Sequence, residues 1–211
     1  MRRFVVRPSM IVWLARRNSV WIGVALLVSL FATACGGRAQ FHGTAYDPPR
    51  PAPPIPGITG NGQPFDLAAL RGKVTLLFFG FTHCPDACPM TMAELRQMHE
   101  QLGDQGQHVA IVFVSTDPER DTPEQLGRYV SLFNPDFLGV HVAAADLPEV
   151  KRSYGVYSEL NTSTPQGSTE GYLIDHSGYI YVIDKAGQLR IAFGYSLPKD
   201  ELLADVQALL R

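Results

Sequence analysis

The sequence predicts one α/β domain in which a central mixed sheet carries helices on both faces. Short apolar runs of strand length alternate with amphipathic stretches of helix length. Two further apolar runs near the C-terminus, separated by a short polar turn, indicate an antiparallel hairpin beside the parallel strands. With 211 residues and 45% hydrophobic content, the chain has enough material for one core plus an extension at one end.

Residues 1–35 are expected to form a secretion signal. Five arginines precede an apolar run from Val20 to Phe31, which ends in small residues. The segment from Ala32 to Gly36 resembles a bacterial lipoprotein processing site, with Ala32 where leucine is usual, so cleavage would leave a lipidated Cys35 at the new N-terminus. The alternative is an uncleaved transmembrane helix, although the apolar run is short against the roughly 20 residues of a span. Both readings place the remaining chain on the extracytoplasmic face of a bacterial membrane.

Residues 36–57 are expected to form a Pro-rich spacer between the membrane and the domain. They contain Gly, Arg, Asp and six prolines, a composition that favours extended polyproline geometry and cannot bury a core. An ordered strand on the domain surface is the alternative for the last few residues, near Ile55. The folded domain is therefore expected to cover residues 58–211.

The first half of the domain alternates strand and helix. Residues 74–79 form a continuous apolar run, which is typical of a buried strand. A helix is expected from Pro89 to about residue 102, with Gly103 after its end. A second buried strand is expected over residues 109–115. Next, Thr122, Pro123 and Gln125 form the start of a helix with a capping box, and this helix should end before Asn134.

The second half adds a strand over residues 138–142 and a short helix that stops at Gly155. A polar stretch over residues 161–171 is expected to be loop. Residues 179–184 and 189–193 are expected to pair as the hairpin, and a last helix begins at Pro198. This order fits a thioredoxin-like fold, whose reactive loop lies between a buried central strand and the helix after it.

Cys84 and Cys88 fall in that loop. Three intervening residues let the two sulfurs reach one metal ion or each other. We expect Cys88 to lie just before the helix, where unpaired amide donors and the helix dipole favour its thiolate. The alternative is a buried inert pair or a stabilising disulfide, which an extracytoplasmic location would favour. Because Cys35 is used in processing, this pair accounts for the remaining cysteines.

Two thiolates alone suit Cu(I), whereas Cu(II) favours a nitrogen donor as well. A histidine near the cysteines would therefore matter for copper binding. His176 follows the polar loop and is free to approach the cysteines, so it is one candidate. Met90 and Met92 are potential soft ligands, although methionines at such spacing more often belong to a helix core. The remaining histidines are less suitable: His42 lies in the spacer, the side chain of His83 should point away from that of Cys84, and His99, His108 and His141 are expected to be solvated or structural.

Four blocks, in this order, resemble the Sco/SenC family and span nearly the whole domain: the run from Phe81 to Pro89 around both cysteines, Ser115 to Pro123, Tyr154 to Tyr157, and Tyr172 to Ser177. The resemblance implies a thioredoxin-like domain that binds one copper ion, Cu(I) or Cu(II), through Cys84, Cys88 and His176. It also implies a role in assembling the dinuclear copper centre of cytochrome c oxidase subunit II. Asp117 would lie near the site, where it would tune copper, contact a partner or only shape its loop.

Two functional classes fit the dithiol. A metallochaperone would bind copper and hand it to the oxidase subunit, with other copper chaperones as further partners. A thiol–disulfide oxidoreductase would instead reduce that target's cysteines and be recycled by a thioredoxin-like reductant; only this second class would be an enzyme. A copper-responsive or redox sensor is a weaker third reading. With a net charge of −2 and no basic cluster beyond the N-terminus, nucleic acid is not an expected partner.

Overall fold

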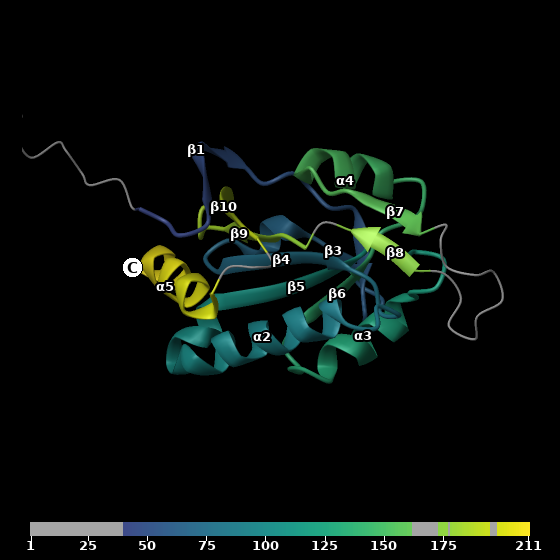
Figure 1. The fold of residues 1–211 in the computed structure, drawn as a ribbon, viewed down its shortest axis with the longest axis horizontal. Coiled ribbons are helices and arrows are strands. Elements are labelled where there is room, and N and C mark those ends of the chain that lie inside the picture. Colours follow the sequence, from purple (N-terminus) through teal and green to yellow (C-terminus); the bar gives the residue numbers. More distant parts are fainter. Residues whose placement is uncertain (1–39, 162–172, 177, 195–197) are drawn as a thin grey trace, which may run out of the picture. The chain divides into compact units, whose positions relative to one another are not determined.

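A mixed eight-stranded sheet forms the centre of the part of the chain that the structure describes, residues 40–161, 173–176, 178–194 and 198–211 of a computed structural model (Figure 1). Strands β4, β5 and β6 are parallel to one another, and every other neighbouring pair in this sheet is antiparallel. In spatial order the strands are β1 (Thr44–Pro51), β10 (Gln188–Phe193), β9 (Ile180–Ile183), β4 (Val74–Gly80), β5 (Val109–Ser115), β6 (Leu138–His141), β2 (Gly57–Thr59) and β3 (Pro64–Phe65).

Helices cover both faces of this sheet, as predicted. Their bounds are α2 (Ala87–Gln101), α3 (Pro123–Ser131), α4 (Leu147–Tyr154) and α5 (Lys199–Leu210), with 3₁₀ turns η2 (Leu67–Leu70) and η3 (Gly103–His108). Buried side chains of α2, α3 and α5 share one core cluster, and those of α4 share the other. Figure 1 shows α2 and α3 below the sheet and α4 above it.

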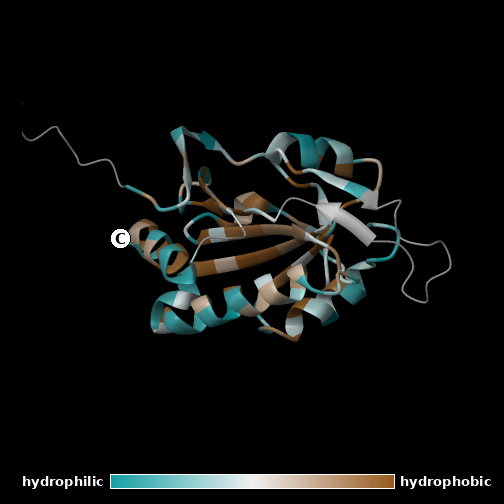
Figure 2. Cartoon of the chain, viewed as in Figure 1, coloured by the Kyte–Doolittle hydropathy of each residue, from teal (hydrophilic) through white to brown (hydrophobic). Residues whose placement is uncertain are grey.

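Strands β4 and β5 are buried along their whole length. Because side chains alternate across a strand, Leu76 and Phe78 enter the cluster under α2, whereas Leu77 and Phe79 enter the opposite one. Strands covered on both faces read as continuous apolar runs, which is why the sequence identifies them well. Figure 2 shows these strongly hydrophobic strands inside a more polar layer of helices.

Helix α3 begins at the predicted capping box. The Thr122 hydroxyl accepts the Gln125 backbone N–H, and the Gln125 side chain accepts the Thr122 backbone N–H. Pro123 stands at the first helical position, where its missing N–H costs nothing. Helix α4 ends at Tyr154, and the next residue, Gly155, adopts a φ of 72° that favours glycine.

Helix α2 begins earlier than predicted. Its first residue is Ala87, after Asp86 at the N-cap position, so Pro89 lies in its first turn and Cys88 lies inside the helix. Proline is tolerated there because the first-turn N–H groups have no partner within the helix. Cys88 was expected just before the helix, whereas it is the second helical residue.

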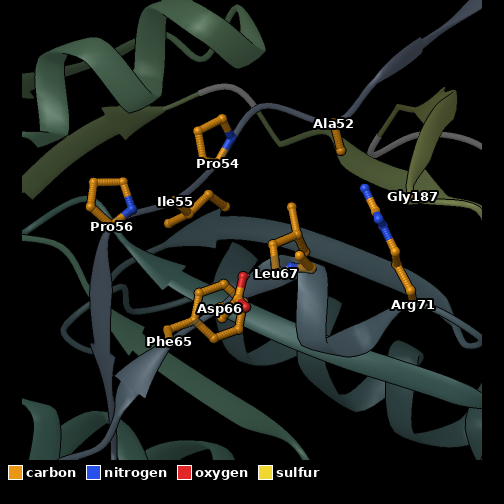
Figure 3. Close-up of a pocket in the computed structure, with 10 residues that line it drawn as sticks. Ala52, Pro54, Ile55, Pro56, Phe65, Asp66, Leu67, Arg71 and Gly187 are labelled. Atoms are coloured by element: carbon orange, nitrogen blue, oxygen red, sulfur yellow. Dashed lines mark hydrogen bonds between the residues drawn. The ribbon is translucent and has the colours of Figure 1, made fainter.

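The expected spacer is partly sheet, which corrects the boundary placed at residue 57. Thr44–Pro51 forms β1 and pairs with β10 at the edge of the sheet, where prolines are compatible with pairing. Ile55 is buried, and Figure 3 shows it with Pro54 and Pro56 beside a hollow of about 430 Å³ that Phe65 also lines. This hollow adjoins the core cluster on the face opposite Cys88.

A small antiparallel sheet, β7 (Ser158–Asn161) with β8 (Leu173–His176), was not predicted. The polar loop expected over 161–171 lies outside the described residues except at Asn161. The predicted signal segment 1–35, with Cys35, lies outside them as well. In the described part of the chain, no helix has the length and apolar character needed to cross a membrane.

Candidate metal site

The cysteine loop connects the end of β4 to the start of α2. Cys84 is partly exposed and Cys88 is fully buried, and the structure has no disulfide between these two residues. The backbone N–H of Cys88 donates to Cys84 Sγ at 3.4 Å, and the N–H of Cys84 donates to the Phe81 carbonyl at 3.3 Å. The loop thus brings the two predicted sulfur ligands to the same helix end.

Cys88 does not favour its thiolate, contrary to our expectation from the helix N-terminus. The pKa of its thiol is raised far above the usual range, first by its hydrogen bond to Cys84 and then by burial. Charge on Cys84 adds to the rise, because two thiolates so close repel each other. Without metal, Cys88 therefore stays protonated, and its own backbone N–H donates to Cys84 Sγ.

Gly80 provides the space for the buried thiol. A Cβ atom at this position would lie 2.8 Å from Cys88 Sγ and 2.9 Å from the Phe113 ring. Such distances are shorter than real Cβ contacts, so a side chain here would displace the sulfur or the ring. The sequence analysis did not single out this glycine, whose role depends on contacts between separate elements.

Asp121 ties the cysteine loop to the segment after β5. This buried carboxylate accepts the Thr82 backbone N–H at 3.0 Å, the Thr82 hydroxyl at 2.5 Å and the Ser115 hydroxyl at 2.7 Å. The parallel register places Gly80 opposite Ser115, so the cysteine loop and the segment after β5 both begin at the carboxyl ends of these strands. Sequence reasoning missed this residue, although it lies inside one of the four family-like blocks.

Asp117 is also buried, and its carboxylate is turned toward Arg120, whose Nε donates at 2.5 Å. The Arg120 guanidinium lies over the Phe81 ring at 5.8 Å, and the Asp117 carbonyl accepts the Asp121 backbone N–H. Asp117 therefore lies beside the cysteine loop, linked to it through Arg120 and Asp121.

His83, Asp117 and Asp121 each place one possible ligand atom within 4.8 Å of the others. The two carboxylates already receive the Arg120 guanidinium and the hydroxyls of Thr82 and Ser115. A cation at this cluster would have to displace these donors. The arrangement is therefore that of a hydrogen-bonded network that holds the loop.

His176 ends β8, and its Cα pairs with that of Ser158 in β7. Ser158 lines a surface groove together with Asp117, so β7 lies beside the loop that follows β5. The His176 side chain lies outside what the structure describes. The structure thus brings Cys84 and Cys88 together, whereas the third predicted ligand is placed only through its backbone.

Four other histidines lie within hydrogen-bond distance of protein groups. His42 Nδ1 lies 2.8 Å from Asp205, His99 Nε2 lies 3.1 Å from the Gly106 carbonyl, and His141 Nδ1 lies 2.8 Å from the Asp121 carbonyl. His83 is exposed, with Nδ1 3.1 Å from the Thr82 hydroxyl. Met92 is buried in the core and Met90 is exposed.

Sequence comparison decides the family. The sequence model of the SCO1/SenC family matches residues 53–211. The chain belongs to this family. It is 40% identical over 138 residues to mitochondrial SCO2 of Saccharomyces cerevisiae, covering 64% of this chain but only 44% of that relative. An SCO2-like protein of Rickettsia prowazekii is 33% identical over 151 residues, covering 71% of this chain and 72% of that protein.

Solved SCO1/SenC structures share the fold. Bradyrhizobium japonicum ScoI with copper bound gives a TM-score of 0.66 at 34% identity, covering 75% of this chain and 98% of that one. Arabidopsis thaliana ScoI with copper bound gives 0.69 at 32% identity, covering 76% and 98%. The predicted thioredoxin-like architecture of this family is confirmed.

Proposed function

We propose that this SCO1/SenC protein is a copper metallochaperone that holds one ion, Cu(I) or Cu(II), through Cys84, Cys88 and His176. Its recipient would be the dinuclear copper site of cytochrome c oxidase subunit II. One observation carries the proposal: two cysteine thiols lie together where the loop after β4 enters α2, one partly exposed and one buried. The copper in the related Bradyrhizobium and Arabidopsis structures supports it.

The donor set suits copper as cargo. Two thiolates match the softness of Cu(I), and an imidazole adds the nitrogen that Cu(II) favours. Because Cys88 is protonated in the metal-free domain, loading releases its proton to solvent, and copper affinity should rise with pH. Partial exposure of Cys84 gives a recipient's thiol a route to the ion.

The proposed setting is the extracytoplasmic face of a bacterial membrane. A lipid on Cys35, or alternatively an N-terminal transmembrane helix, would hold the domain there. The apolar run and small residues before Cys35 support this part of the proposal. A membrane tether would raise the local concentration of the chaperone near a membrane-bound oxidase.

The different exposure of the two sulfurs also supports a second function, disulfide reduction. Cys84 would attack a target disulfide and release one target thiol, and Cys88 would then attack the mixed disulfide and release the second. The products are a reduced target and a Cys84–Cys88 disulfide, which a thioredoxin-like dithiol would reduce again. A third ligand is not needed for this chemistry, so His176 separates the two functions.

The test is copper titration of the reduced full-length protein in detergent, under anaerobic conditions for Cu(I). His176→Ala should weaken Cu(II) binding at least tenfold and Cu(I) binding much less, because two thiolates still satisfy the softer ion. His108→Ala, at an exposed histidine after α2, is the matched control and should leave both affinities unchanged. Equal binding of both ions by His176→Ala and parent would contradict the ligand assignment.

A further inference from the structure

Lys151 lies in the last turn of α4 and fixes the connection from this helix to β7 (Figure 1). Its backbone carbonyl accepts the Val156 N–H at 2.8 Å, and its side-chain Nζ donates to the Ser158 carbonyl at 2.6 Å. A hydrogen bond from a charged donor is stronger than one between neutral groups. One residue therefore ties the start of β7 to α4 at two points.

Helix α4 is a firm support for this connection. Its buried side chains belong to the core cluster on its face of the sheet, and they are Leu147, Val150 and Tyr154. Val156, which follows the helix, is buried in the same cluster. The Ser158 carbonyl is thus bound to an element that is itself held by the core.

The residue that Lys151 holds lies opposite the proposed third ligand. Ser158 is the first residue of β7, and its Cα pairs with that of His176. Among the described strands, β7 and β8 form a sheet of their own, so the ladder of the large sheet does not fix His176. Lys151 and Ser158 line a groove of about 240 Å³ together with Asp117, which places this anchor beside the loop after β5.

We propose that Lys151 is a positioning residue for the copper site, and that its bond to the Ser158 carbonyl sets the backbone position from which His176 reaches the ion. This inference rests on the proposed function. Groups that hold a metal ligand in place raise the affinity of a site, because less order has to be imposed when the ion binds. The effect should concern Cu(II), which favours a nitrogen ligand, whereas two thiolates satisfy Cu(I).

The test compares Lys151→Met with the parent in the full-length reduced protein in detergent, by Cu(II) titration and Cu(I) competition. Methionine keeps the apolar stem of the side chain and removes the donor, so the fold should be retained, as circular dichroism would show. We expect Cu(II) affinity to fall about fivefold, less than the equivalent of one charge-assisted hydrogen bond, and Cu(I) affinity to stay unchanged. In a His176→Ala background, Lys151→Met should weaken Cu(II) no further, because the ligand that it positions is gone.

Lys185→Met is the matched control. Lys185 Nζ also donates to a backbone carbonyl, that of Leu210, but this bond joins the turn between β9 and β10 to the end of α5. This variant should keep both copper affinities. Unchanged Cu(II) affinity in Lys151→Met, equal falls for Cu(II) and Cu(I), or a further fall in the His176→Ala background would overturn the inference. A parent whose Cu(II) affinity does not depend on His176 would instead overturn the proposed function.

Discussion

At the scale of single residues, the buried groups around the cysteine loop depend on one another. Asp121 is fully buried, which is tolerable only because Thr82 and Ser115 donate to its carboxyl group. Its removal would leave these donors buried without an acceptor. The loop that carries Cys84 would then lose its link to the segment after β5.

We predict that Asp121→Ala lowers the free energy of unfolding by about 2–4 kcal/mol, since unsatisfied buried donors are costly. Urea unfolding followed by circular dichroism measures this change. Asp86→Ala is the control, because Asp86 is exposed and makes no side-chain bond to the helix it precedes. A loss below about 0.5 kcal/mol for Asp121→Ala would show that this network contributes little to stability.

At the scale of secondary-structure elements, the sequence predicted what local rules determine. The capping box at Thr122, the stop at Gly155 and the continuous apolar runs of β4 and β5 follow from nearby residues, and all were confirmed. Strand β1 was missed because its pairing depends on β10, about 140 residues away in the chain. The start of α2 was misplaced because proline is allowed at several first-turn positions.

The same limits apply to the site. The cysteines could be predicted from their spacing and from the family resemblance. Gly80 and Asp121 could not be ranked from the sequence, because their importance arises from contacts between β4, α2 and the segment after β5. The protonated state of Cys88 could not be predicted from the sequence either, since it depends on burial and on the position of the Cys84 sulfur.

An ion pair joins the segment before β1 to α5, and it gives stability a dependence on pH. His42 Nδ1 lies 2.8 Å from buried Asp205, whose hydrogen bond raises the pKa of this histidine above 6.5. The contribution of the charged pair is therefore fully present below pH 6.5 and is lost as pH rises through the raised pKa. The backbone N–H groups of His42 and Gly43 also donate to Asp205, and these bonds do not require charge on the histidine ring.

We therefore predict that His42→Ala lowers the melting temperature more at pH 5.5 than at pH 9. Thermal unfolding of parent and variant at both pH values measures the difference. His108→Ala is a suitable control, because His108 is an exposed histidine at the end of η3. A decrease for His42→Ala that is the same at both pH values would show that charge on the histidine does not stabilise the domain.

At the scale of the whole molecule, the fold places the proposed copper site at the carboxyl ends of the parallel strands. Parallel strands β4 and β5 end side by side, so the cysteine loop and the Asp117–Asp121 segment lie next to each other. The strands themselves are fully buried and supply a rigid support for the loop. A rigid support is what a site needs to hold two sulfurs for one ion without reorganising.

The central claim is that Cys84 and Cys88 bind copper as a reduced pair. One pair of sulfurs cannot form a disulfide and ligate a metal as thiolates at the same time. Copper should therefore stabilise the reduced form by RT ln(1 + [L]/Kd), about 4 kcal/mol at a thousandfold excess over Kd. For a two-electron couple, this raises the reduction potential by about 90 mV.

The decisive measurement is the dithiol reduction potential of the full-length protein with and without saturating Cu(I), together with alkylation of both cysteines. Cys88→Ser, which cannot form the pair, serves as the control for copper binding. We predict a more positive potential with copper and protection of Cys84 and Cys88 from alkylation. A potential that is indifferent to copper, with undiminished alkylation in the loaded sample, would contradict the claim and favour the oxidoreductase.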